Sequence, residues 1–168
     1  SSRFAMCRVS RHTASFTQLP DFFEEPDAYI DALSEALHRT GAVVLLPCFE
    51  DVELVIRHRD RLPAHVRVAL PDLADWAVAE DKLDYVERVA AAGCPVPKTH
   101  NVESGADVQR LARELSFPVV VKVRMGNGAR GVEIVETAKE LEPRVFALIE
   151  EFKLPDGRWP IVQEQLSG

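Results

Sequence analysis

Apolar residues in the first part of the chain recur at helical spacing and then run continuously, which predicts alternating helices and strands. A helix is expected over residues 26–40, where the apolar positions fall on one face and Gly41 supplies a C-terminal stop. Residues 42–46 form a continuous apolar run, as expected for a strand of a buried parallel sheet. A second helix is expected over residues 50–61 and a short strand over residues 65–70. This alternation predicts an open sheet with helices packed on it.

Helical spacing dominates the middle of the chain. The elements expected there are a helix from Pro71 to about Val78, a helix over residues 81–92 ending at Gly93, a strand over residues 99–102 and a helix over residues 104–115. Pro95 and Pro97 stiffen the exit from the second of these helices. We therefore expect a domain boundary near Ala79, with the 81–92 helix as a connector.

A lysine lies within an apolar strand in the segment of residues 117–135. Valines flank Lys122, and the glycines Gly126, Gly128 and Gly131 follow it in a short loop. Burying an ammonium group is costly unless an anion meets it, and the backbone N–H groups of such a loop can line an anion site. The segment therefore predicts a site for the phosphates of a nucleotide.

The glycine spacing fits three nucleotide-binding patterns, and the context argues against each. The dinucleotide pattern G-x-G-x-x-G requires a helix after the loop, whereas residues 132–135 are β-branched and predict a strand. The P-loop pattern requires a lysine and a hydroxyl where this chain has Val132 and Glu133. In the protein-kinase loop the lysine follows the glycines, whereas Lys122 precedes them. An ordinary hairpin with a snorkelling lysine remains an alternative at this point.

The last third of the chain predicts one helix and one strand. The helix is expected over residues 137–152, with a capping box formed by Thr137 and Glu140. Pro143 lies beyond its first turn and is expected to split or kink it. A turn at residues 155–157 then leads into a final strand.

Taken in order, these pieces resemble the front half of an ATP-grasp domain. The resemblance is greatest to the carboxylate–amine ligase branch, which includes relatives of the carbamoyl-phosphate synthase ATP-binding domain. The matching segments are L-L-P-C-F-E-D-V-E-L at 45–54, R-V-A-L-P-D-L-A-D at 67–75, E-D-K-L-D-Y-V at 80–86, A-G-C-P-V-P-K-T at 92–99, the lysine strand with its glycine loop, and I-V-Q-E-Q-L-S-G at 161–168.

The resemblance implies an α/β fold that becomes α+β in its second part. A partial pre-ATP-grasp domain with a Rossmann-like open sheet is expected over residues 1–79, a connecting helix and linker over residues 80–97, and an incomplete N-terminal lobe of an ATP-grasp domain over residues 98–168. Both ends look truncated, so the chain is expected to be a fragment of a larger ligase and inactive alone.

The resemblance also implies roles for individual residues. Lys82 and Lys122 are expected to reach nucleotide phosphates. The flap over the phosphates is expected to comprise Gly126, Asn127, Gly128, Ala129, Arg130 and Gly131. The hinge that holds adenine, largely through backbone groups, is expected to comprise Gln163, Glu164 and Leu166. Catalytic residues are not assigned, and the Mg²⁺ ligands are expected outside this segment.

Some of these positions depart from the family or have plainer interpretations. Family loops often carry serine where this chain has Ala129, and proline where it has Val123. Lys82 alone is also compatible with a solvated helix residue, Glu164 with an exposed strand carboxylate, and Arg130 with a side chain that points into solvent.

Composition narrows the functional classes. The chain of 168 residues is 46% hydrophobic and 28% charged, which is typical of a globular protein. A net charge of −7 without a basic run argues against a nucleic-acid partner, and no apolar run approaches the roughly 20 residues of a membrane span. Three widely spaced cysteines suit neither a disulfide framework nor a zinc site, which favours reduced thiols in the cytoplasm.

The function implied by the resemblance is ATP-dependent ligation of a carboxylate to an amine or a thiol through an acyl phosphate. ATP and Mg²⁺ are the expected cofactors, an unidentified small carboxylate the substrate, and a homodimer one expected assembly. The alternatives are a non-catalytic nucleotide-binding regulatory module, a structural α/β domain without ligand, and a phosphotransferase that uses the same cleft.

Overall fold

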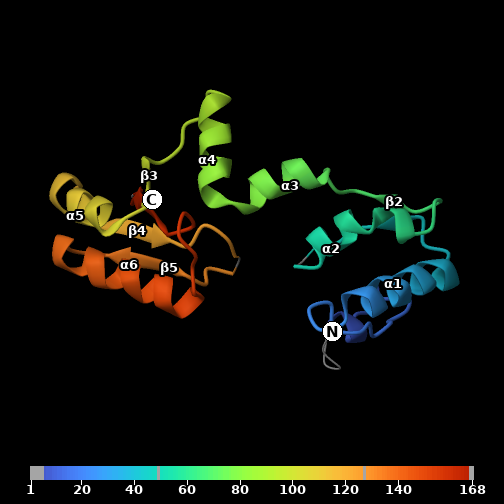
Figure 1. Cartoon of the computed structure of the whole chain (residues 1–168). Helices are drawn as coiled ribbons and strands as arrows, with labels where there is room; N and C mark the ends of the chain where they lie inside the picture. Colours follow the sequence, from blue (N-terminus) through green and yellow to red (C-terminus); the bar gives the residue numbers. More distant parts are fainter. Residues whose placement is uncertain (1–5, 49, 127, 167–168) are drawn as a thin grey trace. The chain divides into compact units, whose positions relative to one another are not determined.

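The computed structural model describes residues 6–48, 50–126 and 128–166 and has a mixed α/β fold (Figure 1). The chain forms two compact units, one ending at Trp76 and one beginning at Ala77. The helix α3 (Leu73–Glu80) contains this division. The finer boundaries predicted near residues 79 and 97 stay predictions. No helix in the described parts of the chain is long and apolar enough to cross a membrane.

The first unit is built around the helix α1 (Pro26–Thr40), which has the bounds predicted from its apolar spacing. Its buried residues Tyr29, Ile30, Leu33 and Leu37 form the centre of that unit's hydrophobic core. Gly41 ends the helix in the left-handed conformation, with φ of 64°, where glycine carries no Cβ penalty. A short 3-10 helix, η1 (Met6–Val9), precedes α1.

The sheet of the first unit is smaller than predicted. The strands β1 (Val44–Leu45) and β2 (Arg67–Val68) pair in parallel, as expected, but each is only two residues long. The helix expected over residues 50–61 is divided into α2 (Val52–Arg57) and the 3-10 helix η2 (Arg59–Arg61).

The apolar run at residues 42–46 is not buried, which corrects the prediction of a buried strand. The exposed fractions of Val43 and Leu46 are both 64%, and that of Val44 is 48%. The reason is architectural, because the sheet described here has two strands and leaves part of β1 without neighbours.

The second unit contains a four-stranded antiparallel sheet in the order β3-β6-β4-β5. Its strands are β3 (Thr99–Asn101), β4 (Val119–Lys122), β5 (Val132–Val135) and β6 (Ile161–Glu164). Its helices are α4 (Lys82–Ala91), α5 (Gly105–Glu114) and α6 (Ala138–Phe152). The helices α5 and α6 pack against each other and share a core with the sheet (Figure 1).

Strand alternation separates the core from the candidate site. Val119 and Val121 point into the core with α5 and α6, so Val120 and Lys122 project from the opposite face. On the neighbouring strand β6, Val162 belongs to this core, whereas the side chain of Gln163 projects from the opposite face of the sheet. The register pairs Val121 with Val162, which brings the two core-facing positions together.

Two details of α6 differ from the prediction. Thr137 is the N-cap residue, but its side chain makes no capping hydrogen bond, and the Glu140 carboxylate accepts instead from the Glu136 N–H at 3.2 Å. The helix continues through Pro143 as one element, so it is not split there, and the kink that was the other expectation stays a prediction. Buried Leu141 and Val145 on either side anchor the helix to the core and offset the backbone hydrogen bond lost at the proline.

Candidate functional site

Lys82 and Lys122, which lie 40 positions apart in the sequence, meet at one pocket of the second unit. The pocket has a volume of about 270 Å³. Its lining residues are Ala79, Lys82, Tyr85, Val86, Pro97, Lys122, Ile161 and Gln163. They come from α3, α4, the segment before β3, and the strands β4 and β6.

The ammonium of Lys122 is held by a chain of neutral hydrogen-bonding groups. Its Nζ donates to Gln163 Oε1 at 2.6 Å, and Gln163 Nε2 donates to Thr99 Oγ1 at 2.8 Å. Thr99 Oγ1 in turn donates to the carbonyl of Pro97 at 2.9 Å. Each bond fixes a position, but none of these partners neutralises the lysine charge.

Lys82 begins α4 and is held by the glycine loop. Its Nζ donates to the carbonyl oxygen of Gly126 at 2.7 Å and to that of Arg124 at 3.4 Å. Burial lowers the pKa of Lys82, and the positive charge of Lys122 lowers it further, while the carboxylate of Glu80 acts in the opposite direction. The carboxylates of Glu80 and Asp81 therefore offset only part of the effect of burial on this pKa.

Neither lysine has a carboxylate partner in the described part of the chain. No salt bridge within 4.0 Å joins Lys82 or Lys122 to an acidic side chain, although several arginines of this chain do form such bridges. Two partly buried ammonium groups with neutral partners make a site suited to a polyanion such as the phosphates of a nucleotide.

The glycine loop consists of an exposed part and a tightly packed neck. Gly126, Gly128 and Ala129 have φ values of 114°, 63° and 62° and are exposed. At the neck, the Val123 N–H donates to the carbonyl of Gly131 at 2.8 Å. A Cβ added to Gly131 would lie 2.5 Å from Val123 Cγ2, so this position admits only glycine without rearrangement.

The loop residues predicted to form a flap are therefore not equivalent. Arg130 is exposed, and Asn127 lies outside the described residues. The loop turns a carbonyl oxygen toward Lys82 in this structure, so the binding of phosphate by its backbone N–H groups stays a prediction.

A buried ion pair beside the pocket was not anticipated from the sequence. Arg124 Nε donates to Asp81 Oδ1 at 2.9 Å, and both residues are buried. Burial raises the pKa of the Asp81 carboxyl, but the hydrogen bond from Arg124 and that from the Leu83 N–H outweigh it, so the pKa lies below its ordinary value. An aspartate before a helix is a readable capping signal, but nothing local links it to Arg124.

The segment that contains this site matches a known family. Residues 81–152 match the family described as carbamoyl-phosphate synthase L chain, ATP binding domain. Over this segment the chain is similar to ATP-grasp proteins. The predicted resemblance is thereby confirmed, as is the mixed α/β fold.

Two curated relatives illustrate the match in sequence. The chain is 42% identical over 71 residues to a D-alanine–D-alanine ligase of Desulforudis audaxviator, covering 41% of this chain and 23% of the relative. It is 35% identical over 65 residues to the carbamoyl phosphate synthase large chain of Mycobacterium tuberculosis, covering 39% and 6%. The chain thus spans less than a quarter of either relative.

The structural comparison supports the same ATP-grasp fold. The biotin carboxylase domain of 2-oxoglutarate carboxylase from Hydrogenobacter thermophilus superimposes with a TM-score of 0.65 at 19% identity. The match covers 84% of this chain and 32% of that chain. The Hydrogenobacter domain is a dimer in complex with MgADP, ADP and bicarbonate.

Two of the predicted ATP-grasp hinge residues lie away from the lysine pocket. Glu164 Oε1 accepts from the Lys98 N–H at 2.8 Å, and Glu164 lines a separate pocket of about 220 Å³. Leu166 is 66% exposed. Gln163 does reach the lysine pocket, through the side chain that fixes Lys122. The role of these three residues in adenine binding stays a prediction.

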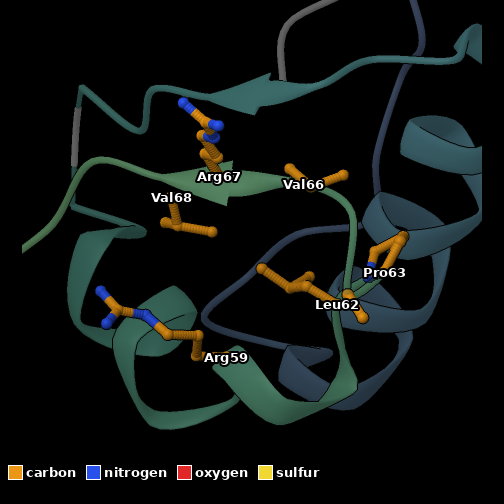
Figure 2. A pocket seen from close by; sticks show the side chains of 7 residues that line it. Arg59, Leu62, Pro63, Val66, Arg67 and Val68 are labelled. Carbon is orange, nitrogen blue, oxygen red and sulfur yellow. The ribbon is translucent and has the colours of Figure 1, made fainter.

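A third pocket, of about 430 Å³, lies in the first unit (Figure 2). Arg67 and Val68 point to opposite sides of β2, so the Arg67 guanidinium lies away from Leu62 and Val68 (Figure 2). Arg59 Nη2 donates to the carbonyls of Leu70 and Pro71 at 2.9 and 3.2 Å. The guanidinium groups of Arg59 and Arg67 therefore do not lie together in this pocket (Figure 2).

The lysine pocket fits phosphate oxygens and does not fit a metal ion. Its lining residues include no carboxylate. Over the described ranges, no group of three His, Cys, Asp or Glu side chains is placed to hold a metal. The residues that line this pocket therefore suit a polyanion, and no Mg²⁺ ligand can be named among them.

Proposed function

We propose that this chain supplies the ATP-binding part of an ATP-dependent ligase that joins a carboxylate to an amine or a thiol. The observation that carries the proposal is the pair of lysine ammonium groups, without carboxylate partners, at one pocket of the segment that matches the ATP-binding family. The MgADP and bicarbonate bound to the structural relative support a phosphate ligand and a carboxylate-like substrate.

In the proposed reaction, a carboxylate oxygen attacks the γ-phosphorus of ATP, which gives an acyl phosphate and releases ADP. The amine or thiol then attacks the acyl carbon, phosphate leaves, and the nucleophile loses its proton. Lys82 and Lys122 neutralise charge on the phosphates, because phosphoryl transfer depends mainly on positioning and electrostatic stabilisation. The exposed part of the glycine loop covers the phosphates and excludes water.

The remaining site residues complete the proposal. Gly126, Gly128, Ala129, Arg130 and Gly131 form the described part of the flap, and Gln163, Glu164 and Leu166 present backbone groups to adenine. The protein is proposed to be cytoplasmic, in line with the free thiols of Cys48 and Cys94. A homodimer is the proposed assembly, in line with the dimer that the Hydrogenobacter domain forms.

Replacing Lys122 tests the proposal directly. A ligand that binds only the native state raises the melting temperature, so Mg-ADP is expected to stabilise the wild-type protein. Lys122→Ala removes a charged hydrogen bond of about 1.5–3 kcal/mol and should weaken Mg-ADP binding about 10- to 100-fold. The measurement is a thermal-shift titration with calorimetry, and Lys139→Ala, an exposed lysine of α6, is the matched control.

Each outcome of this experiment decides between the functional classes. The absence of any Mg-ADP effect on the wild-type protein contradicts nucleotide binding and favours a structural domain. In the full-length protein, ADP binding without ADP formation from ATP, over a panel of carboxylates and amines, favours a regulatory module. ADP formation that requires a carboxylate acceptor supports the ligase.

A further inference from the structure

The carboxylate of Asp81 joins three parts of the candidate site. It caps α4 by accepting from the N–H groups of Leu83 and Asp84, at 3.0 and 3.4 Å. It also accepts from Arg124 at the root of the glycine loop and from Arg158 in the segment before β6. Only 1% of Asp81 is exposed, so its charge depends on these partners for its stability.

Of these partners, Arg124 has the geometry to fix the position of the Asp81 carboxylate. It is 8% exposed, and its Nε and Nη2 approach the two Asp81 oxygens at 3.0 Å or less. Its Nη2 also bonds Asp84 Oδ1 at 3.1 Å. The planar guanidinium holds a carboxylate in a defined plane, which a lysine ammonium does not do.

The backbone of Arg124 holds the residue that follows Asp81. The Lys82 N–H donates to the Arg124 carbonyl at 3.0 Å, and Lys82 Nζ lies 3.4 Å from the same oxygen. The side chain of Arg124 therefore restrains Asp81, and its main chain restrains Lys82. These are consecutive residues at the start of α4, so the loop root and the helix are clamped at two points.

We propose that Arg124 is a positioning residue, which through Asp81 holds the ammonium of Lys82 in the lysine pocket. The inference rests on the proposed nucleotide site and adds to it a residue that need not touch the nucleotide. Arg124 does not line the pocket, and its charge is matched by Asp81 and Asp84. Arg124 therefore affects a bound anion by fixing the position of the Lys82 ammonium.

Arg124→Lys tests this role because it keeps the charge and loses the planar clamp. Mg-ADP binding by the folded protein should weaken at least ~10-fold, equivalent to ~1.4 kcal/mol. A second readout needs no nucleotide: NMR titration of Lys82 Nζ should show its pKa moving toward the ordinary lysine value as burial is lost. Arg110→Lys, which alters the exposed bridges to Asp107 and Glu114 on α5, is the matched control.

A purely structural role would give a different pattern. It predicts a lower free energy of unfolding in urea with unchanged Mg-ADP affinity and an unchanged Lys82 titration, and that result overturns the proposal. If Arg124→Lys does not fold, Asp81→Asn keeps a capping acceptor and removes the ion pair. Mg-ADP affinity is then the readout, because loss of the Asp81 charge by itself lowers the Lys82 pKa. Losses in affinity from Arg124→Lys and Lys82→Ala should not add, since both act through one ammonium, and additive losses contradict the mechanism.

The two proposals fail in distinguishable ways. A wild-type protein that does not bind Mg-ADP contradicts the nucleotide site, while the Lys82 titration still decides whether Arg124 positions it. If Arg124→Lys binds Mg-ADP as tightly as the wild-type protein does, the proposed nucleotide site stands and Arg124 has no positioning role in it.

Discussion

At the scale of single residues, the glycine loop depends on one position much more than on the others. Gly131 combines a φ of 68° with a neighbour, Val123, whose methyl carbons occupy the space where a Cβ would lie. Gly128 has a similar φ of 63° but no atom within 4 Å of such a Cβ. The two positions therefore separate backbone strain from steric exclusion.

Gly131→Ala should destabilise the protein by about 2–4 kcal/mol, since it adds overpacking against buried Val123 to the cost of a left-handed alanine. Gly128→Ala carries only the backbone cost, about 1–2 kcal/mol. Urea unfolding of both variants measures the difference. Equal losses would show that the neck of the loop relaxes and that Gly131 is not sterically required.

The sequence revealed the two lysines but not the arrangement that holds them. Lys122 was readable because an isolated charge interrupts four valines, whereas Lys82 was singled out only through the resemblance to ATP-grasp domains. The pair Arg124–Asp81 joins residues 43 positions apart, with α4, β3, α5 and β4 between them in the sequence. No local periodicity encodes such a contact, so the sequence alone does not predict it.

At the scale of elements, α1 was predicted more accurately than the strand that follows it. The bounds of α1 follow from its apolar face and from Gly41, both of which lie within the segment itself. The apolar run at residues 42–46 predicted a longer, buried strand, but the length and burial of a strand depend on its neighbours. Only two residues of this run pair with β2.

The element α6 offers a test of how much a proline costs within a continuous helix. Pro143 is exposed and lies inside the helix, so Pro143→Ala restores an N–H donor without changing the core. The variant should be more stable by about 1–2 kcal/mol, since a helix propensity gain of ~3 kcal/mol is offset partly by the greater entropy of the unfolded chain. Thermal or urea unfolding measures this, and a variant no more stable than wild type would show that the local backbone has already adapted to the proline.

At the scale of the whole molecule, a chain of net charge −7 keeps two unneutralised cations at one pocket. The lowered pKa of Lys82 means that part of the free protein loses this charge at a pH below the ordinary lysine value of 10.5. A bound anion favours the charged form and raises the pKa again. Binding and protonation of the protein are therefore linked.

Mg-ADP binding should accordingly take up protons at alkaline pH, between the lowered pKa of Lys82 and its value in the complex. Calorimetry in buffers of different ionisation enthalpy measures the number of protons exchanged. In Lys82→Arg the uptake should vanish, because the guanidinium stays charged over this range. Uptake of the same size in that variant would assign the effect to another group.

The bond between Lys122 and Gln163 has an evolutionary consequence. A glutamine codon becomes a glutamate codon by one nucleotide change, and the carboxylate would fit where the amide now lies. In such a descendant the glutamate would form an ion pair with Lys122, and the pocket would lose the excess positive charge that attracts a polyanion. The neutral amide of Gln163 thus keeps the pocket able to bind an anion. Homologous sequences can be sorted by whether they carry glutamine or glutamate at this position.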